Sequence, residues 1–325
     1  MKVLVTGGAG YVGSVIVEAL VHEGHQVIVI DNLQQGHRIA VMPQAEFCKV
    51  DIGDRDALMK VFACRKIDAV MHFAAYSCVG ESMIKPTEYF RNNVASGINL
   101  LNTMIKHKVL TLVFSSSASI YGEPKGLTID EGTLQNPDSP YGESKLIFEK
   151  MLRWYYHAYG LRSISLRYFN AAGASLCFGE DHNPETHLIP NVLRVAMGKM
   201  EKLNLFGNDY PTKDGGCVRD YVHVLDIAQA HIIALEHLDH NQLCKAYNLG
   251  NGEGYSVLEV IETASRVCGT KIPFEVNSRR PGDPATLIAN HALIKNDLGW
   301  TPKFSSLESM INSAWQWHHK FPNGY

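Results

Sequence analysis

A tyrosine and a lysine four residues apart could form a proton-transfer pair. Tyr141 and Lys145 open a segment whose apolar residues recur every three or four positions, which predicts a helix. Residues i and i+4 lie on one face of a helix, so the ammonium would stand beside the phenol. The positive charge favours the phenolate, which would lower the pKa of Tyr141 from its usual value of about 10 and make it a general base.

A serine triplet upstream could share the proton. Ser115, Ser116 and Ser117 follow an apolar run, residues 111–114, that predicts a strand. In open α/β sheets ligands bind at the carboxyl ends of the strands, and Ser117 would lie there. A Tyr-x-x-x-Lys pair alone is also explained as an ordinary i,i+4 contact, so the interpretation depends on its surroundings.

The start of the chain supplies those surroundings. An apolar run over residues 2–6 leads into Gly-Gly-Ala-Gly-Tyr-Val-Gly at residues 7–13, then a segment with helical periodicity, then a second apolar run over residues 26–31. Strand, glycine-rich turn, helix and strand in this order are the context of a dinucleotide-binding fingerprint.

Each part of this fingerprint has a physical role. Gly7 permits a tight turn, Gly10 lets backbone N–H groups approach a pyrophosphate, and Gly13 lets the helix pack on the sheet. The helix N-terminus favours phosphate. Asp31, at the end of the second strand, would bind the ribose 2′-hydroxyl and repel a 2′-phosphate. The sequence therefore predicts NAD as cofactor rather than NADP.

The remaining periodicity predicts an α/β fold. Further strands are predicted at residues 46–50, 69–73, 111–114 and 163–167, with helices at 57–62 and 88–106. This alternation indicates a doubly wound parallel sheet, the Rossmann fold.

The pattern changes from about residue 171, where Gly, Pro and Asn become frequent. The strands predicted there, residues 203–206, 246–248 and 272–276, are isolated, and a helix over 305–319 ends the chain. We expect an NAD-binding domain over residues 1–170, to which later segments return, and a smaller mixed α/β substrate lobe mainly over residues 171–325.

Composition excludes several classes of protein. A formal net charge of −3, a pI near 6.6 and the absence of a Lys/Arg stripe argue against a nucleic-acid partner. No apolar run approaches bilayer-spanning length, so no membrane association is expected. Seven cysteines without a Cys-x-x-Cys motif indicate reduced thiols. A first strand at Lys2 leaves no room for a signal peptide, and a cytoplasmic location is expected.

The histidines do not predict a metal site. There are fifteen, and the closest grouping, His237 and His240 with Cys244, is not completed by a further ligand at familiar spacing. We expect solvated histidines and no metal.

Two arginines of the second half suit bidentate phosphate recognition. Arg219 and Arg280 stand in loops rich in Gly and Pro. Each is equally explained as a surface ion pair.

Taken together, these segments resemble the extended short-chain dehydrogenase/reductase family, and more narrowly its UDP-glucose 4-epimerase group. The match covers essentially the whole chain. It is carried by residues 7–13, 31–33, 72–75, 79–82, 114–117, 121–122, 141–145, 166–170, 206–211, 218–223, 247–250 and 322–325.

The resemblance implies a retained NAD⁺ and interconversion of UDP-galactose and UDP-glucose through transient oxidation at sugar C4. Tyr141 would take the proton of the 4-hydroxyl, Ser117 would share or relay it, and Lys145 would lower the Tyr141 pKa and bind the nicotinamide ribose. Besides Tyr141 and Lys145, the implied cofactor contacts are Gly7, Gly10, Tyr11, Val12, Gly13, Asp31, Asn32, Leu33, Gly36, Asp51, Ile52, Phe73, Ala74, Ala75, Ser77, Asn92 and Phe169. The implied contacts with the UDP-sugar are Ser117, Tyr141, Asn170, Leu188, Phe206, Arg219, Arg280 and Asp283.

Family members also dimerise by packing two helices per subunit into a four-helix bundle, so a homodimer is expected. Met151, Leu152 and Trp154 on the helix that follows Tyr141 are compatible with this bundle. Burial in the subunit's own core explains them equally well.

Four positions separate this chain from its relatives. Related dehydratases carry an Asp-Glu pair where this chain has Ala118 and Ser119, so elimination of water would lack its catalyst and epimerisation is favoured. Ser77 stands where some epimerases have a lysine that reaches the cofactor. Leu287 stands at a pocket wall where relatives carry Tyr or Cys, so UDP-GalNAc and UDP-GlcNAc are possible further substrates.

Two other functions stay open at this point. A UDP-glucuronate or UDP-pentose 4-epimerase would share every catalytic residue. A non-catalytic Rossmann protein that senses nucleotides would need neither Tyr141 nor Lys145, although both are present.

Overall fold

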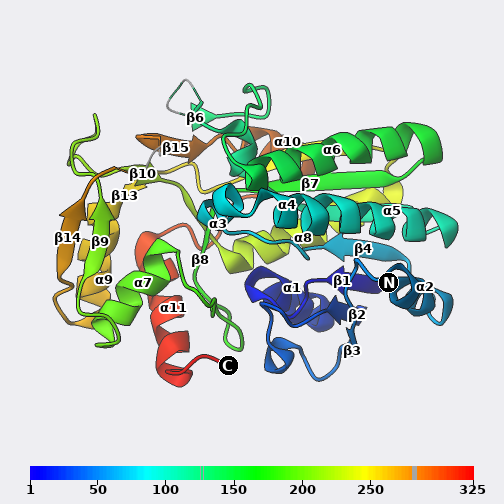
Figure 1. Cartoon of the computed structure of the whole chain (residues 1–325), viewed down its shortest axis with the longest axis horizontal. Coiled ribbons are helices and arrows are strands. Elements are labelled where there is room, and N and C mark those ends of the chain that lie inside the picture. Colours follow the sequence, from blue (N-terminus) through cyan, green and yellow to red (C-terminus); the bar gives the residue numbers. More distant parts are fainter. Residues whose placement is uncertain (125, 127, 280–283) are drawn as a thin grey trace.

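The computed structural model describes residues 1–325 except 125, 127 and 280–283. Its centre is a seven-stranded parallel sheet in the order β12-β7-β5-β4-β1-β2-β3. The strands are β1 (Lys2–Thr6), β2 (Gln26–Asp31), β3 (Glu46–Lys49), β4 (Ala69–His72), β5 (Thr111–Ser117), β7 (Arg162–Tyr168) and β12 (Cys244–Leu249). This confirms the predicted doubly wound sheet (Figure 1).

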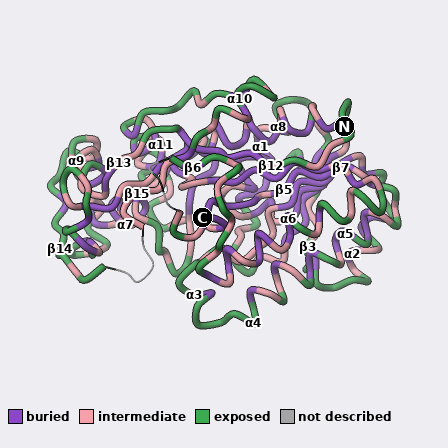
Figure 2. Tube along the Cα trace, turned by 90° about the horizontal axis from the view of Figure 1, so that it is seen from above, coloured by how far each residue is buried: buried purple, intermediate pink, exposed green. Residues whose placement is uncertain are grey.

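Helices cover both faces of this sheet. They are α1 (Tyr11–His22), α2 (Arg55–Ala63), α3 (Val79–Ile84), α4 (Pro86–Tyr89), α5 (Ser96–Lys106), α6 (Pro140–Tyr159), α8 (Val224–His240) and α10 (Ala292–Leu298), with short turns η1 (Arg38–Ala40), η2 (Phe90–Ala95) and η3 (Ala118–Tyr121). Successive strand residues point to opposite faces. In β1, Val3 and Val5 therefore join the core under α1 and α8, and Leu4 joins the core under α2, α5 and α6. Figure 2 shows the strands as a buried layer.

A smaller lobe lies beyond the carboxyl ends of the strands (Figure 1). It contains β6 (Thr128–Ile129), β8 (Asn170–Ala172), β9 (Leu203–Phe206), β10 (Val218–Arg219), β11 (Tyr221–His223), β13 (Tyr255–Ser256), β14 (Phe274–Asn277) and β15 (Thr286–Ala289), with α7 (Leu188–Ala196), α9 (Val257–Cys268) and α11 (Leu307–Lys320). The strands form one four-stranded sheet, β13-β10-β15-β6, and two pairs, β11-β8 and β14-β9. A third core joins α7, α9 and α11.

Two sequence predictions were wrong. The strands predicted as isolated are paired: β12 pairs with β7 at the edge of the main sheet, and β9 pairs with β14 in the lobe. The histidines are not all solvated: His72, His223 and His231 are buried, and Tyr168 Oη lies 2.6 Å from His231 Nε2. A buried imidazole needs a polar partner, and a tyrosine that is distant in sequence supplies it.

In the part of the chain that the structure describes, no helix has both the length and the apolarity needed to cross a membrane.

A buried ion pair fixes α6 on the sheet. Arg167, on β7, donates from Nη2 to Glu149 Oε2 at 2.7 Å and from Nε to Oε1 at 3.0 Å, and both side chains are 3% exposed. Ser116 donates to Glu149 Oε1 at 2.6 Å, and Arg167 Nη1 donates to the Tyr121 hydroxyl at 2.7 Å. The helix that carries Tyr141 is thereby bound to the neighbouring strands β5 and β7.

We predict that Glu149→Gln lowers the free energy of unfolding by about 3–5 kcal/mol, because the guanidinium of Arg167 would stay buried without its counter-charge. The matched control is Glu308→Gln, since Glu308 pairs with Arg266 at 3.2 Å and both side chains are more than half exposed. That change should cost less than about 1 kcal/mol. Urea unfolding measures both, and equal losses would contradict the prediction.

Candidate active site

The first turn of α6 is fixed by its own sequence. Ser139 is the N-cap and accepts a hydrogen bond from Gly142 N at 3.2 Å, and Pro140 occupies the first turn. A Cβ on Gly142 would lie 2.4 Å from the carbonyl oxygen of Ser119. Only glycine therefore lets α6 approach the segment that follows β5 this closely.

This approach brings the predicted catalytic residues together. Ser117 is the last residue of β5, and a hydrogen bond links its side chain with Tyr141. Lys145 Nζ donates to the carbonyl oxygen of Ser115 at 2.7 Å and lies 5.8 Å from the centre of the Tyr141 ring. All three side chains are buried at the carboxyl edge of the sheet.

The expected lowering of the Tyr141 pKa is not observed. Burial raises the pKa of Tyr141, and the hydrogen bond with Ser117 acts in the opposite direction. Burial also lowers the pKa of Lys145 to about 7, against the opposing charge of Glu149. The i,i+4 spacing predicts that Tyr141 and Lys145 are neighbours, but it does not predict that both are buried. Burial disfavours the charged form of each side chain.

The glycine turn has the geometry of a phosphate cradle. Gly7 has a φ of 71°, and a Cβ there would lie 2.5 Å from Ala74 N. A Cβ on Gly13 would lie 2.2 Å from the carbonyl oxygen of Gly7. By contrast, a Cβ on Gly10 would meet only that same oxygen, at 3.5 Å, so this side of the turn is open. An open glycine face at a helix N-terminus fits the pyrophosphate of a dinucleotide.

Asp31 lies beside this turn at the end of β2. It accepts hydrogen bonds from Ala9 N at 3.0 Å and from Leu33 N at 2.8 Å. Burial raises its pKa, and the two backbone bonds oppose this shift. The neighbouring predicted contacts also gather here: Asn32 donates to Asp51 Oδ2 at 2.9 Å, and a Cβ on Gly36 would lie 2.8 Å from the carbonyl carbon of Ala9.

Asn93 is a positioning residue that the sequence did not single out. Its Oδ1 accepts from Tyr76 N at 2.8 Å and from Asn92 Nδ2 at 2.9 Å, and its Nδ2 donates to Tyr76 O and to Ser144 Oγ, both at 3.0 Å. It therefore ties the loop after β4, which holds the predicted contacts Phe73, Ala74, Ala75 and Ser77, to α6. The paired asparagines were the available signal, but η2 is a π-helical turn, and ordinary helical periodicity does not predict which of them faces inward.

Tyr11 joins the glycine turn to the lobe. It is the first residue of α1, and its hydroxyl donates to the carbonyl oxygen of Gly173 at 2.6 Å. Val12, the next predicted cofactor contact, is partly buried and packs against the core under α1, whereas Ile52 is buried in the core on the other face.

The predicted substrate contacts lie on several elements of the lobe. Leu188 opens α7, Phe206 ends β9, and Arg219 ends β10, where it donates to the carbonyl oxygen of Val218 at 2.8 Å. Asn170 donates from Nδ2 to the carbonyl oxygen of Asp220 at 2.8 Å. Arg280 and Asp283 lie outside the described residues.

Leu287 lies near the end of β5, the strand that carries Ser117. Its backbone pairs in register with Arg219. Its side chain, like that of Phe169, packs against a small buried cluster that includes Ala118, Ile120 and Tyr121. This cluster contains the turn directly after Ser117, so Leu287 is close to the predicted sugar site.

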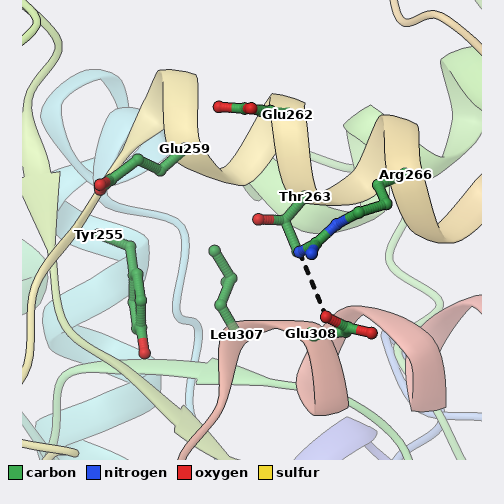
Figure 3. A pocket seen from close by; sticks show the side chains of 7 residues that line it. All are labelled: Tyr255, Glu259, Glu262, Thr263, Arg266, Leu307 and Glu308. Carbon is green, nitrogen blue, oxygen red and sulfur yellow. Dashed lines mark ion pairs between the residues drawn. The ribbon is translucent and has the colours of Figure 1, made fainter.

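A surface groove elsewhere in the lobe is not the candidate site. It measures about 440 Å³, lies between α9 and α11, and is lined by Tyr255, Glu259, Glu262, Thr263, Arg266, Leu307 and Glu308 (Figure 3). Its one arginine pairs with Glu308 at 3.2 Å. The remaining carboxylates, Glu259 and Glu262, would repel a diphosphate.

Comparison with known proteins identifies the family of this chain. The model of the NAD dependent epimerase/dehydratase family matches residues 3–250. A UDP-glucose 4-epimerase of Halalkalibacterium halodurans is 51% identical, and the alignment covers 100% of this chain and 98% of that protein.

Solved structures agree as well. A crystal structure of a UDP-glucose 4-epimerase has a TM-score of 0.98 at 49% identity and covers 100% of this chain and 99% of that one. The Bifidobacterium longum UDP-glucose 4-epimerase in complex with NAD⁺ and UDP has a TM-score of 0.95 at 39% identity, with 100% of both chains covered. The chain therefore belongs to the NAD dependent epimerase/dehydratase family, within its group of UDP-glucose 4-epimerases.

Proposed function

We propose that this chain interconverts UDP-galactose and UDP-glucose by NAD-dependent oxidation at sugar C4 and reduction from the opposite face. One observation carries the proposal: Ser117, Tyr141 and Lys145 meet at the carboxyl edge of the sheet. They do so in a chain about half identical, over its whole length, to UDP-glucose 4-epimerases.

The cofactor would lie across the glycine turn. Gly7, Gly10 and Gly13 would hold its pyrophosphate, and Asp31 would accept hydrogen bonds from its adenosine ribose. When bound, NAD supplies the acceptor and donor of hydride that the reaction at C4 requires. We further propose that residues 1–170, with α8 and β12 returning to them, hold the cofactor, and that residues 171–325 mainly hold the UDP-sugar.

The catalytic residues would move one proton. Tyr141 takes it from the sugar 4-hydroxyl and returns it to the 4-keto intermediate. The hydrogen bond with Ser117 favours the charged form of Tyr141 that takes the proton. Lys145 is held by the carbonyl oxygen of Ser115 at 2.7 Å and so stays beside the phenol.

The turn after Ser117 supports epimerisation over elimination of water. Ala118 is buried and Ser119 accepts a hydrogen bond from Ser117 Oγ at 3.2 Å. Neither side chain can act as the carboxylic acid or base that elimination needs.

We predict that Tyr141→Phe lowers kcat for UDP-galactose by at least about 100-fold, because the phenol is the proton acceptor. The matched control is Tyr156→Phe, on the same helix, whose hydroxyl donates to the carbonyl oxygen of Gln242 at 3.3 Å. The anomeric proton followed by NMR, without added NAD, measures both. Undiminished turnover by Tyr141→Phe would contradict catalysis by this residue. Absence of turnover by the wild type would favour a nucleotide sensor.

We also propose that the sugar pocket admits an N-acetyl group. Leu287 is smaller than the Tyr found at this position in some relatives, and it packs beside the turn that follows Ser117. A Leu287→Tyr variant should lose at least about tenfold in turnover of UDP-GalNAc relative to UDP-galactose, because the phenol would fill that space. Leu287→Met, which conserves volume, should keep the wild-type ratio. If Leu287→Tyr is equally active on both sugars, the proposal fails.

We propose that the chain forms a homodimer through α5 and α6. The two helices are neighbours, since Tyr155 on α6 donates to Asn102 Oδ1 on α5 at 2.8 Å. Trp154 on α6 is 73% exposed and Ile98 on α5 is 38% exposed. Leu152, by contrast, is buried in the subunit's own core. Exposed apolar side chains on adjacent helices are typical of an interface.

The oligomeric state tests this proposal. Light scattering should give about twice the chain mass for the wild type and the chain mass for Trp154→Asp, because a charge would be buried at the interface. Leu134→Asp is the control. Leu134 is also apolar and 79% exposed, but it lies in a loop between α5 and α6 and on neither helix. A monomeric wild type, or a dimeric Trp154→Asp, would overturn it.

We propose a reducing, cytoplasmic location. All seven cysteines are free thiols, which is typical of proteins from such compartments. Recovery of the activity outside the cytoplasmic fraction of the source cells would contradict it.

A further inference from the structure

Two histidines and two glutamates converge in the loop between β8 and α7. They are Glu180, His182, Glu185 and His187, and each offers one nitrogen or oxygen atom within 4.8 Å of the others. This set falls within eight residues of sequence and includes none of the predicted catalytic residues. The chemistry proposed above does not use it.

The distances suit a single small cation. His187 Nδ1 lies 2.8 Å from Glu180 Oε1 and 2.9 Å from Glu185 Oε1. His182 Nδ1 lies 3.2 Å from Glu180 Oε1 and 3.8 Å from Glu185 Oε2. In a tetrahedral site with metal–ligand bonds of about 2.0–2.2 Å, neighbouring ligand atoms are about 3.3–3.6 Å apart, so small movements would complete the site.

The cluster is largely enclosed. The side chains of Glu180, Glu185 and His182 are 9%, 4% and 23% exposed, whereas that of His187 is 48% exposed. The ring of Tyr11 stands edge-on to His182, with 6.4 Å between the ring centres. Burying two carboxylates is costly unless a positive charge compensates them. With neutral imidazoles the four groups carry a charge of −2, which one divalent cation would balance.

We propose that Glu180, His182, Glu185 and His187 bind one divalent transition-metal ion, with zinc as the best match, in a structural site. Two imidazoles and two carboxylates are ligands that zinc accepts, and four protein ligands leave no open position for catalysis. Magnesium and calcium would be disfavoured, because they prefer six or more oxygen ligands.

The position of this site gives it a consequence for binding. Leu188, the first residue of α7, follows His187 directly, and Tyr11 opens the helix after the glycine turn. A metal ion here would fix the start of α7 beside the start of α1. This arrangement would hold the substrate lobe beside the glycine turn that would bind the cofactor, and that consequence rests on the proposed function. The metal site itself does not rest on it.

A metal-free cluster of ion pairs is the competing explanation. Glu180 and Glu185 raise the pKa of His187 to about 11. Burial alone would lower the pKa of His182, but hydrogen bonds to the same carboxylates raise it to about 9. Two protonated histidines would then balance the carboxylates without a metal. A cysteine at position 187 separates the two explanations, because its thiolate can bind zinc but cannot replace a protonated histidine.

The experiment uses the full chain, treated with a chelator and then given zinc. Bound zinc is measured by mass spectrometry after desalting, and Tm is measured with and without zinc. The variants are His187→Gln, which keeps a hydrogen-bonding group but removes a ligand, and His187→Cys, whose thiolate binds zinc at about 2.3 Å but cannot act as a cation. His240→Gln at the exposed end of α8 is the control, and magnesium replaces zinc in a parallel series.

We expect about one equivalent of zinc, and a raised Tm, for the wild type, His187→Cys and His240→Gln. His187→Gln should bind much less zinc and show no rise in Tm, and magnesium should have no effect. Absence of stoichiometric zinc in the wild type would overturn the proposal, as would full zinc binding by His187→Gln or its loss in His187→Cys when circular dichroism shows that variant folded. Because zinc content and Tm are independent of turnover, failure of this proposal and failure of the proposed function are distinguishable.

Discussion

The buried pair of Glu149 and Arg167 is the interaction on which the geometry of the proposed active site depends. It ties the middle of α6 to β7, while Gly142 lets the first turn of the same helix touch the backbone at Ser119. These two contacts leave α6 little freedom to rotate or slide on the sheet. Tyr141 therefore meets Ser117 because the helix is held at both places. A charged pair suits this task, since its geometry is directional and breaking it in the core is costly.

The second constraint is the connection between the sheet and the lobe. Asn93 holds the loop after β4 against α6, and Tyr11 holds the start of α1 against Gly173. Each of these bonds joins segments far apart in sequence at the same edge of the sheet. The elements that would hold the cofactor, the proton acceptor and the sugar are therefore positioned by a few buried polar contacts in addition to the apolar cores. Such contacts are specific, because a buried donor or acceptor that loses its partner is penalised.

The sequence predicts the features that depend on residues close together along the chain, and it does not predict those that depend on contacts between distant residues. Buried parallel strands are continuous apolar runs, so β1 and β2 were predicted to the residue, and the glycine turn identified their connection. The strand at residues 246–248 was called isolated because pairing with β7 is a long-range contact that periodicity does not contain. Asn93 and the group around Glu180 were missed for the same reason: their roles depend on which side chains the folded chain brings together.

The ionisation of Tyr141 and Lys145, the proposed catalytic pair, is also not predicted by the sequence. Burial moves the pKa of Tyr141 up and that of Lys145 down, because an enclosed site disfavours a negative phenolate and a positive ammonium alike. Burial thus opposes the phenolate that a general base must present, and the hydrogen bond with Ser117 acts in the opposite direction. In the proposed reaction Tyr141 is a phenolate before it takes the proton of the sugar hydroxyl and a neutral phenol afterwards, and Lys145 is held beside it. A raised pKa makes that phenolate a stronger base, and the neutral phenol can then return the proton to the 4-keto intermediate.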